Sequence, residues 1–89
     1  MSVDIDLKAC SILEKLSAEF KGVEVDYTCT QDIHQFMLTT QGITREIGFA
    51  QRVLELRNIP DIEQVVTKLI NDIKAGSAPR RIMFHTRAA

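Results

Sequence analysis

The soft or borderline metal ligands in the sequence are two histidines, His34 and His85, and two cysteines, Cys10 and Cys29. A structural zinc site normally gathers about four ligands, supplied as closely spaced pairs of donors. These four positions are too widely separated to form such pairs, although Cys29 and His34 could approach each other if they flank a hairpin. We therefore expect no metal site and no bound cofactor.

A catalytic Cys–His pair could form between Cys29 and either His34 or His85. Catalysis would also need a third group to orient the histidine and donors to stabilise an oxyanion, and the sequence indicates neither. Cys29 continues the alternating apolar pattern of residues 23–27, which predicts that its thiol faces the core and is inert. We expect no catalytic residue and no enzymatic activity.

The glycines form neither of the Gly-rich motifs that bind phosphate, GxGxxG and GxxxxGK. Nucleotide binding is therefore not expected. Gly48 lies inside a strand pattern, where glycine usually marks a bulge or the close approach of another backbone.

Two segments have apolar residues at steps of three and four, residues 4–20 and 62–74, and this spacing predicts two amphipathic helices. Gly22 supplies the left-handed residue that ends the first helix. The second is expected to begin at Asn58–Asp61, because asparagine caps a helix well and Pro60 fits its first turn. Gly76 ends it.

Between the helices, apolar and polar residues alternate over residues 23–29 and 43–49, which predicts two strands with one face on the core. Residues 33–40 form a further strand, but the unbroken run Phe36-Met37-Leu38 leaves its register open. Gln41-Gly42 predicts a tight turn. Residues 51–57 suit either a continuing strand or one helical turn, and we favour the strand.

These elements predict one α+β domain over residues 1–76, with the order α-β-β-β-α and a three-stranded antiparallel meander packed against two helices. Residues 77–89 form an arginine-rich apolar tail. Three alternatives remain open for it: a short fourth strand at 81–85 on the sheet edge, a strand donated to another copy, or a flexible peptide that becomes ordered on a partner.

The composition fits a small globular protein, with 89 residues of which 45% are apolar and 26% charged. The first residues lack the pattern of a secretory signal, and no apolar run approaches the roughly 20 residues that span a bilayer. Two isolated cysteines suit free thiols in a reducing compartment. We expect a cytoplasmic protein that does not enter a membrane.

The function expected from these features is a non-catalytic protein interaction or adaptor domain that self-associates. A domain this small should leave apolar surface uncovered, and such surface favours a protein partner or a homodimer. The predicted partner contacts are the apolar residues of the second strand and of the tail: Phe36, Leu38, Ile82, Met83 and Phe84.

Weak nucleic-acid binding is the alternative function. Residues 1–43 carry seven acidic and three basic side chains, about −4, whereas residues 44–89 carry five acidic and eight basic, about +3. Arginine clusters favour phosphate contacts. The predicted anion contacts are Arg45, Arg52, Arg80 and Arg81.

The order of helix, three strands and helix resembles that of the double-stranded-RNA-binding domain over about the same stretch of chain. That family places a lysine-rich motif at the start of its second helix. Here the corresponding residues are Ile59-Pro60-Asp61-Ile62-Glu63, an acidic helix start that would repel phosphate. We therefore do not assign the chain to that family.

Overall fold

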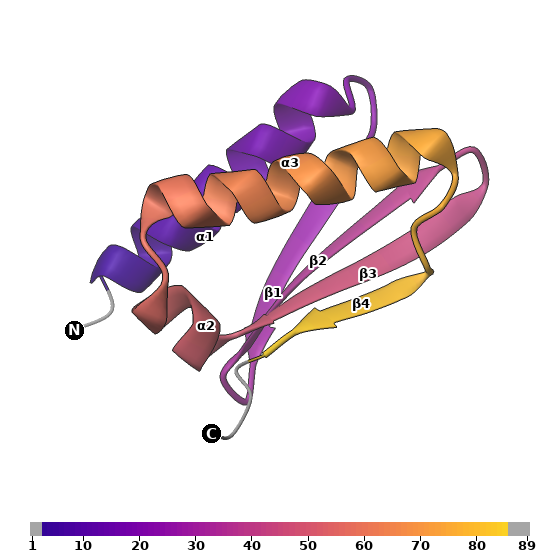
Figure 1. Cartoon of the computed structure of the whole chain (residues 1–89). Helices are drawn as coiled ribbons and strands as arrows, with labels where there is room; N and C mark the ends of the chain where they lie inside the picture. The colour runs from indigo at the N-terminus through magenta and orange to yellow at the C-terminus, as the bar shows by residue number, and fades with distance from the viewer. Residues whose placement is uncertain (1–2, 86–89) are drawn as a thin grey trace.

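The computed structural model describes residues 3–85, so residues 86–89 of the predicted tail lie outside the described residues (Figure 1). The described chain is an α+β arrangement with a four-stranded mixed sheet, which confirms the predicted fold class and the predicted fourth strand. The elements in chain order are α1 (Val3–Glu19), β1 (Val25–Thr30), β2 (Ile33–Thr40), β3 (Ile43–Ala50), α2 (Gln51–Leu56), α3 (Ile59–Ala75) and β4 (Arg81–Phe84).

The first three strands form the predicted antiparallel meander, and the sheet order is β1-β2-β3-β4. Two-residue turns, Gln31-Asp32 and Gln41-Gly42, connect them, and all four of these residues have positive φ. Positive φ at both central residues defines the type I′ turn, whose twist matches that of a hairpin. β4 runs parallel to β3, because α2 and α3 form the crossover between them.

The register of β2, which the sequence left open, follows from its pairing with β3. Phe36 pairs with Ile47 and Leu38 pairs with Arg45. Phe36, Leu38 and Ile47 are all buried beneath the helices, whereas Met37 lies on the opposite face and is only partly covered. Met37 therefore faces outward while its two neighbours pack inward.

One hydrophobic core lies between the sheet and the helices. α1 and α3 both lie over the same face of the sheet (Figure 1), and each presents one apolar stripe to it. The fully buried side chains from the two layers are Ile12, Leu16, Phe36, Leu38, Ile47, Phe49, Leu54, Ile62 and Val66. None of the helices described lies over the opposite face of the sheet, which is called the open face below.

The α3 boundaries follow the predicted capping. The Asn58 side chain accepts a hydrogen bond from the Asp61 N–H at 2.9 Å, and Pro60 lies in the first turn. Gly76 adopts φ 79° and its N–H closes the last turn. Both ends of this helix are therefore determined by local sequence.

The prediction that residues 51–57 continue the third strand is wrong, because residues 51–56 form the short helix α2. β2 begins at Ile33, which pairs with Ala50, so a strand that continued past Ala50 would have no neighbour there. In a helix, the adjacent residues Val53 and Leu54 can both reach the core, and both are buried.

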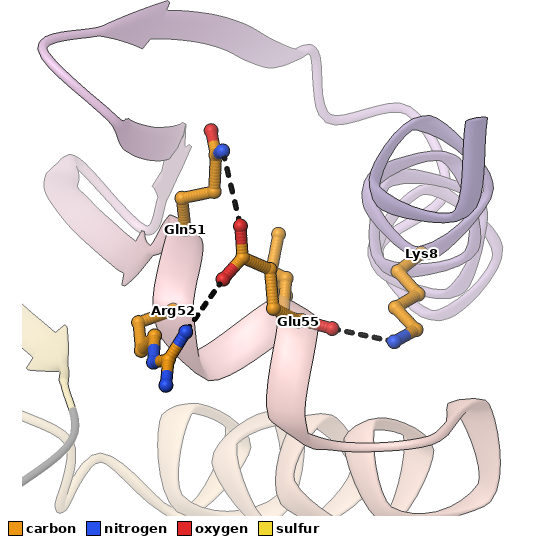
Figure 2. A network of polar contacts seen from close by, with 5 residues as sticks. Lys8, Gln51, Arg52 and Glu55 are labelled. Atoms are coloured by element: carbon orange, nitrogen blue, oxygen red, sulfur yellow. Dashed lines mark hydrogen bonds and ion pairs between the residues drawn. The ribbon is translucent and has the colours of Figure 1, made fainter. Parts of the chain in front are cut away.

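Side-chain contacts hold α2 in place (Figure 2). Lys8 of α1 donates a hydrogen bond to the Leu54 carbonyl. Within α2, Glu55 accepts hydrogen bonds from Gln51 at 3.3 Å and from Arg52 at 3.4 Å. A hydrogen bond therefore connects the short helix to α1, and the Glu55 carboxylate links two side chains of its first turn.

The two leucines of α2 provide a direct test of this helix. Leu54 is 0% exposed and Leu56 is 62% exposed, although residues two apart in a strand would share a face. Leu54→Ala should lower the free energy of unfolding by about 2–5 kcal/mol, because it leaves a cavity in the core. Leu56→Ala should change it by less than about 0.5 kcal/mol.

Urea denaturation of both variants measures these two changes. Equal losses at the two positions would contradict the helical assignment.

An ion pair between α1 and α3 should make stability depend on pH. Glu19 accepts a hydrogen bond from Lys74 at 3.0 Å, and this contact lowers the pKa of the Glu19 carboxyl below its ordinary value of 4.5. A carboxyl with a depressed pKa stabilises the fold above its unfolded pKa, and this contribution is lost as the pH falls through its folded pKa.

Glu19→Gln should therefore be slightly less stable than wild type at pH 7, and the difference should disappear at pH values well below 4.5. Thermal unfolding across this pH range measures the difference. Glu14→Gln, an exposed position on the same helix with no ion pair among residues 3–85, is the control. A difference for Glu19→Gln that persists unchanged at low pH would exclude the ion pair as its cause.

Candidate interaction surface along the fourth strand

β4 forms one edge of the sheet, and no other described strand pairs with its outer side. The Glu46 N–H donates to the Arg80 carbonyl at 2.7 Å, and the parallel register pairs Glu46 with Arg81 and Gly48 with Met83. Parallel pairing uses the peptide groups of alternate residues, so Ile82 and Phe84 bond toward β3. The N–H and C=O groups of Arg81 and Met83 consequently point along the free edge.

The open face beside this edge carries an apolar side chain next to a polar network. Met83 lies over Gly48 and is 42% exposed. A Cβ atom at Gly48 would lie 2.7 Å from the Met83 sulfur, so the group that approaches this glycine closely is a side chain and not the backbone that the sequence led us to expect. Glu46 accepts from Gln35 at 2.9 Å and pairs with Arg81 at 3.6 Å.

A cleft of about 720 Å³ lies where α2, α3 and the ends of β3 and β4 meet. Phe84 stacks on Phe49 at its base, with ring centroids 4.8 Å apart. Leu56 and Val65 contribute to its apolar wall, and its charged or titratable side chains are Arg57, Asp61 and His85. The full lining comprises Phe49, Val53, Leu56, Arg57, Asp61, Ile62, Val65, Met83, Phe84 and His85.

The five predicted partner contacts divide into two groups. Phe36 and Leu38 are buried in the core of this chain, so neither is available at its surface. Phe36 and Leu38 lie on either side of Met37 in the strand, so both point to the inner face of β2. β2 is a central strand, and the helices cover this face. Ile82 and Phe84 are half-buried on the inner face of β4, and Met83 is exposed on its outer face. Only the contacts from the tail reach the surface.

The four predicted anion contacts are not gathered on one surface. Arg45 is 5% exposed; its Nη1 donates to the Thr40 hydroxyl at 3.1 Å and its buried Nε has no partner among the described residues. Arg52 pairs with Glu55 beyond the end of β3, whereas Arg81 pairs with Glu46 in its middle. Arg80 is exposed next to Arg81. No continuous basic patch results from these four residues.

The structure brings Cys29 and His34 together across the hairpin, as the sequence permitted, but the exposure of the cysteines differs from the prediction. Cys10 and Cys29 are both exposed, so the prediction that the Cys29 thiol is buried is wrong. Cys29 does share the inner face with Val25 and Tyr27, but β1 is an edge strand that the helices cover incompletely. His34 is buried and pairs across the hairpin with Cys29, while His85 lines the cleft.

Sequence reasoning missed two residues that the structure brings into prominence. Leu56 forms part of the cleft wall. If residues 51–56 form a helix, Leu56 points away from the buried pair Val53 and Leu54, and this was the only indication in the sequence that it would be exposed. Tyr27 contacts His34. Its position two residues before Cys29 on an alternating strand could have indicated that both face the same cross-strand neighbours.

Within residues 3–85, no three side chains of the kinds that bind metals, His, Cys, Asp or Glu, are close enough together to hold an ion. None of the helices described is long and apolar enough to cross a membrane. Comparison of the sequence with protein-family models and with curated proteins finds no match.

Proposed function

We propose that the domain is a non-catalytic interaction module that self-associates through the free edge of β4. The observation that carries this proposal is the parallel register of β4, which leaves the backbone groups of Arg81 and Met83 without a partner among residues 3–85, next to an exposed methionine side chain. An edge strand with free N–H and C=O groups is a template for pairing with another strand. The partner proposed here is a second copy of the same chain.

The register of such a dimer follows from which peptide groups are free. In an antiparallel pair, each hydrogen-bonded residue must face a residue whose groups also point outward. Arg81 therefore pairs with Met83 of the second copy, and the two-fold axis passes beside Ile82. This register uses four backbone hydrogen bonds and keeps the two Arg81 side chains from lying directly opposite each other, which would be unfavourable.

The side chains support the same register. Arg81 and Met83 both lie on the open face, so the aliphatic stem of Arg81 would pack on the methionine of the second copy. On the inner face, the half-buried Ile82 would meet its own counterpart. Leu56 and the cleft lie beside this edge and add apolar surface to the contact.

The dimer should be weak, because β4 has only four residues. Each backbone hydrogen bond contributes about 0.5–1.5 kcal/mol net, and binding must also offset the loss of translational and rotational freedom. Self-association should therefore depend strongly on protein concentration. A cytoplasmic location is part of the proposal, because two exposed free thiols suit a reducing compartment.

A protein partner is favoured over nucleic acid by the placement of the arginines. Arg45 is buried, and Arg52 and Arg81 are each paired with a glutamate. Phosphate binding would require these pairs to open without any continuous basic surface to compensate.

Met83→Pro tests the backbone contact selectively. Proline removes the outward N–H of residue 83 but leaves the bonds that residues 82 and 84 make to β3, and an edge strand tolerates proline when its N–H faces outward. Light scattering over a concentration series should show a dimer for wild type and a monomer for Met83→Pro. Met83→Thr keeps the N–H and a strand-forming side chain, so it should retain most of the association.

Hydrogen exchange at the Ile82 and Phe84 amides confirms that β4 stays docked in the proline variant. A wild-type protein that remains monomeric up to millimolar concentration would overturn the proposal. So would a Met83→Pro variant that dimerises as strongly as wild type.

A further inference from the structure

A second group of reactive side chains lies at the opposite edge of the sheet, on β1 and β2. Cys29 pairs with His34 across the hairpin, and the Cys29 Sγ lies 3.8 Å from the His34 Nε2. The other ring nitrogen, Nδ1, lies 2.6 Å from the Tyr27 hydroxyl. The Tyr27 and His34 rings are nearly parallel, with an interplanar angle of 10°. The histidine is thus held between a phenol and a thiol.

The histidine is buried and the cysteine is exposed, and this combination favours a reactive thiol. His34 is 3% exposed, whereas Cys29 is exposed. A reagent can therefore reach the sulfur from solvent while the imidazole is shielded from water. A buried ring nitrogen needs a hydrogen-bond partner, and the Cys29 thiol is the only partner described for Nε2. The histidine can accept the thiol proton at this atom.

The neighbouring groups on α1 and β1 favour a neutral phenol beside the histidine. Burial raises the pKa of the Tyr27 hydroxyl, and the nearby acidic groups of Cys29, Asp6 and Cys10 raise it further. Tyr27 therefore stays protonated at neutral pH. Its oxygen can accept from the Nδ1–H of His34 and so orient Nε2 toward the sulfur.

We propose that Cys29 is a modification site for small electrophiles, with His34 as its proton acceptor, and that a hydroperoxide oxidises it to a sulfenic acid. The thiolate is the reactive form of cysteine, and a histidine within hydrogen-bond reach can take the thiol proton as the sulfur attacks. This site is independent of the β4 edge, because it uses the other edge strand of the sheet.

The reaction is balanced without any further reagent. His34 Nε2 takes the thiol proton, and the Cys29 sulfur attacks the hydroxyl-bearing oxygen of the hydroperoxide. A sulfur–oxygen bond forms and the oxygen–oxygen bond breaks, so the sulfur is oxidised and the peroxide is reduced. The departing alkoxide takes a proton from His34, and the products are the Cys29 sulfenic acid and an alcohol, or water from hydrogen peroxide.

The shape of the surface favours a small reagent. None of the grooves described within residues 3–85 is lined by Cys29. A bulky substrate such as a peptide would need a cleft to hold it near the sulfur. A hydroperoxide needs only access to the sulfur, which the edge position provides.

Cys10 is an internal control, because it is an exposed free thiol of the same chain that has no hydrogen bond to a histidine among the described contacts. Each thiol is measured separately, Cys29 in the Cys10→Ser variant and Cys10 in the Cys29→Ser variant. The full-length protein is treated with hydrogen peroxide, the sulfenic acid is trapped with dimedone, and mass spectrometry gives the rate at each pH from 5 to 9.

At pH 7, Cys29 should be oxidised at least about tenfold faster than Cys10. In the Cys10→Ser background, His34→Gln removes the proton acceptor, so it should reduce the Cys29 rate to the Cys10 level and change the pH–rate profile. Because His34 is buried and its replacement could disturb folding, Tyr27→Phe is the second variant. It keeps the ring and should lower the Cys29 rate severalfold with the far-UV circular dichroism unchanged.

Two results would overturn the proposal. One is equal oxidation rates at Cys29 and Cys10. The other is a Cys29 rate and pH profile that are the same in wild type, His34→Gln and Tyr27→Phe.

Discussion

The structure depends on the burial of one face of the sheet beneath two helices. Strands spaced about 4.8 Å apart place the edges of a four-stranded sheet about 14 Å from each other, whereas the axes of two packed helices lie about 10 Å apart. The helices therefore cover β2 and β3 completely, and Phe36 and Ile47 are fully buried. The two edge strands, β1 and β4, are covered only in part.

Both candidate sites result from this limited coverage. On β1, Cys29 faces the helix layer yet remains exposed, and on β4 the half-buried Ile82 and Phe84 lie on the same inner face. The strands that hold the core together carry no accessible reactive group of their own. Reactivity and association are therefore expected at the borders of the sheet, where packing constrains the side chains less.

Local sequence patterns predicted most of the fold, because hydrophobic periodicity and capping act over a few residues. The two long helices, the three-stranded meander and the Gln41-Gly42 turn were predictable in this way, whereas the fourth strand was one of three alternatives left open for the tail. Residues 51–57 were not, since apolar residues at positions 53, 54 and 56 suit either structure over so short a stretch. The deciding fact is non-local: β2 begins at Ile33 and offers no partner beyond Ala50.

The sites were harder to predict because they also depend on contacts between residues far apart in the sequence. Alternation assigns Cys29 to a face of the sheet, but exposure depends on how far the helices extend over that face. The pairing of Cys29 with His34, and the contact of His34 with Tyr27, require the hairpin register. Phe36 and Leu38 were assigned to a partner because the sequence did not reveal which of three consecutive apolar residues points outward.

The parallel position of β4 has a consequence for how the chain folds during synthesis. The edge of β3 that β4 covers stays open until α2, α3 and residues 81–84 have all been made. Pairings between residues far apart in sequence form slowly, and until they form, the unpaired strand edges can make non-native contacts. Because Gly48 of β3 has no side chain, the space above it stays free for Met83 until β4 has been synthesised and can pair with β3.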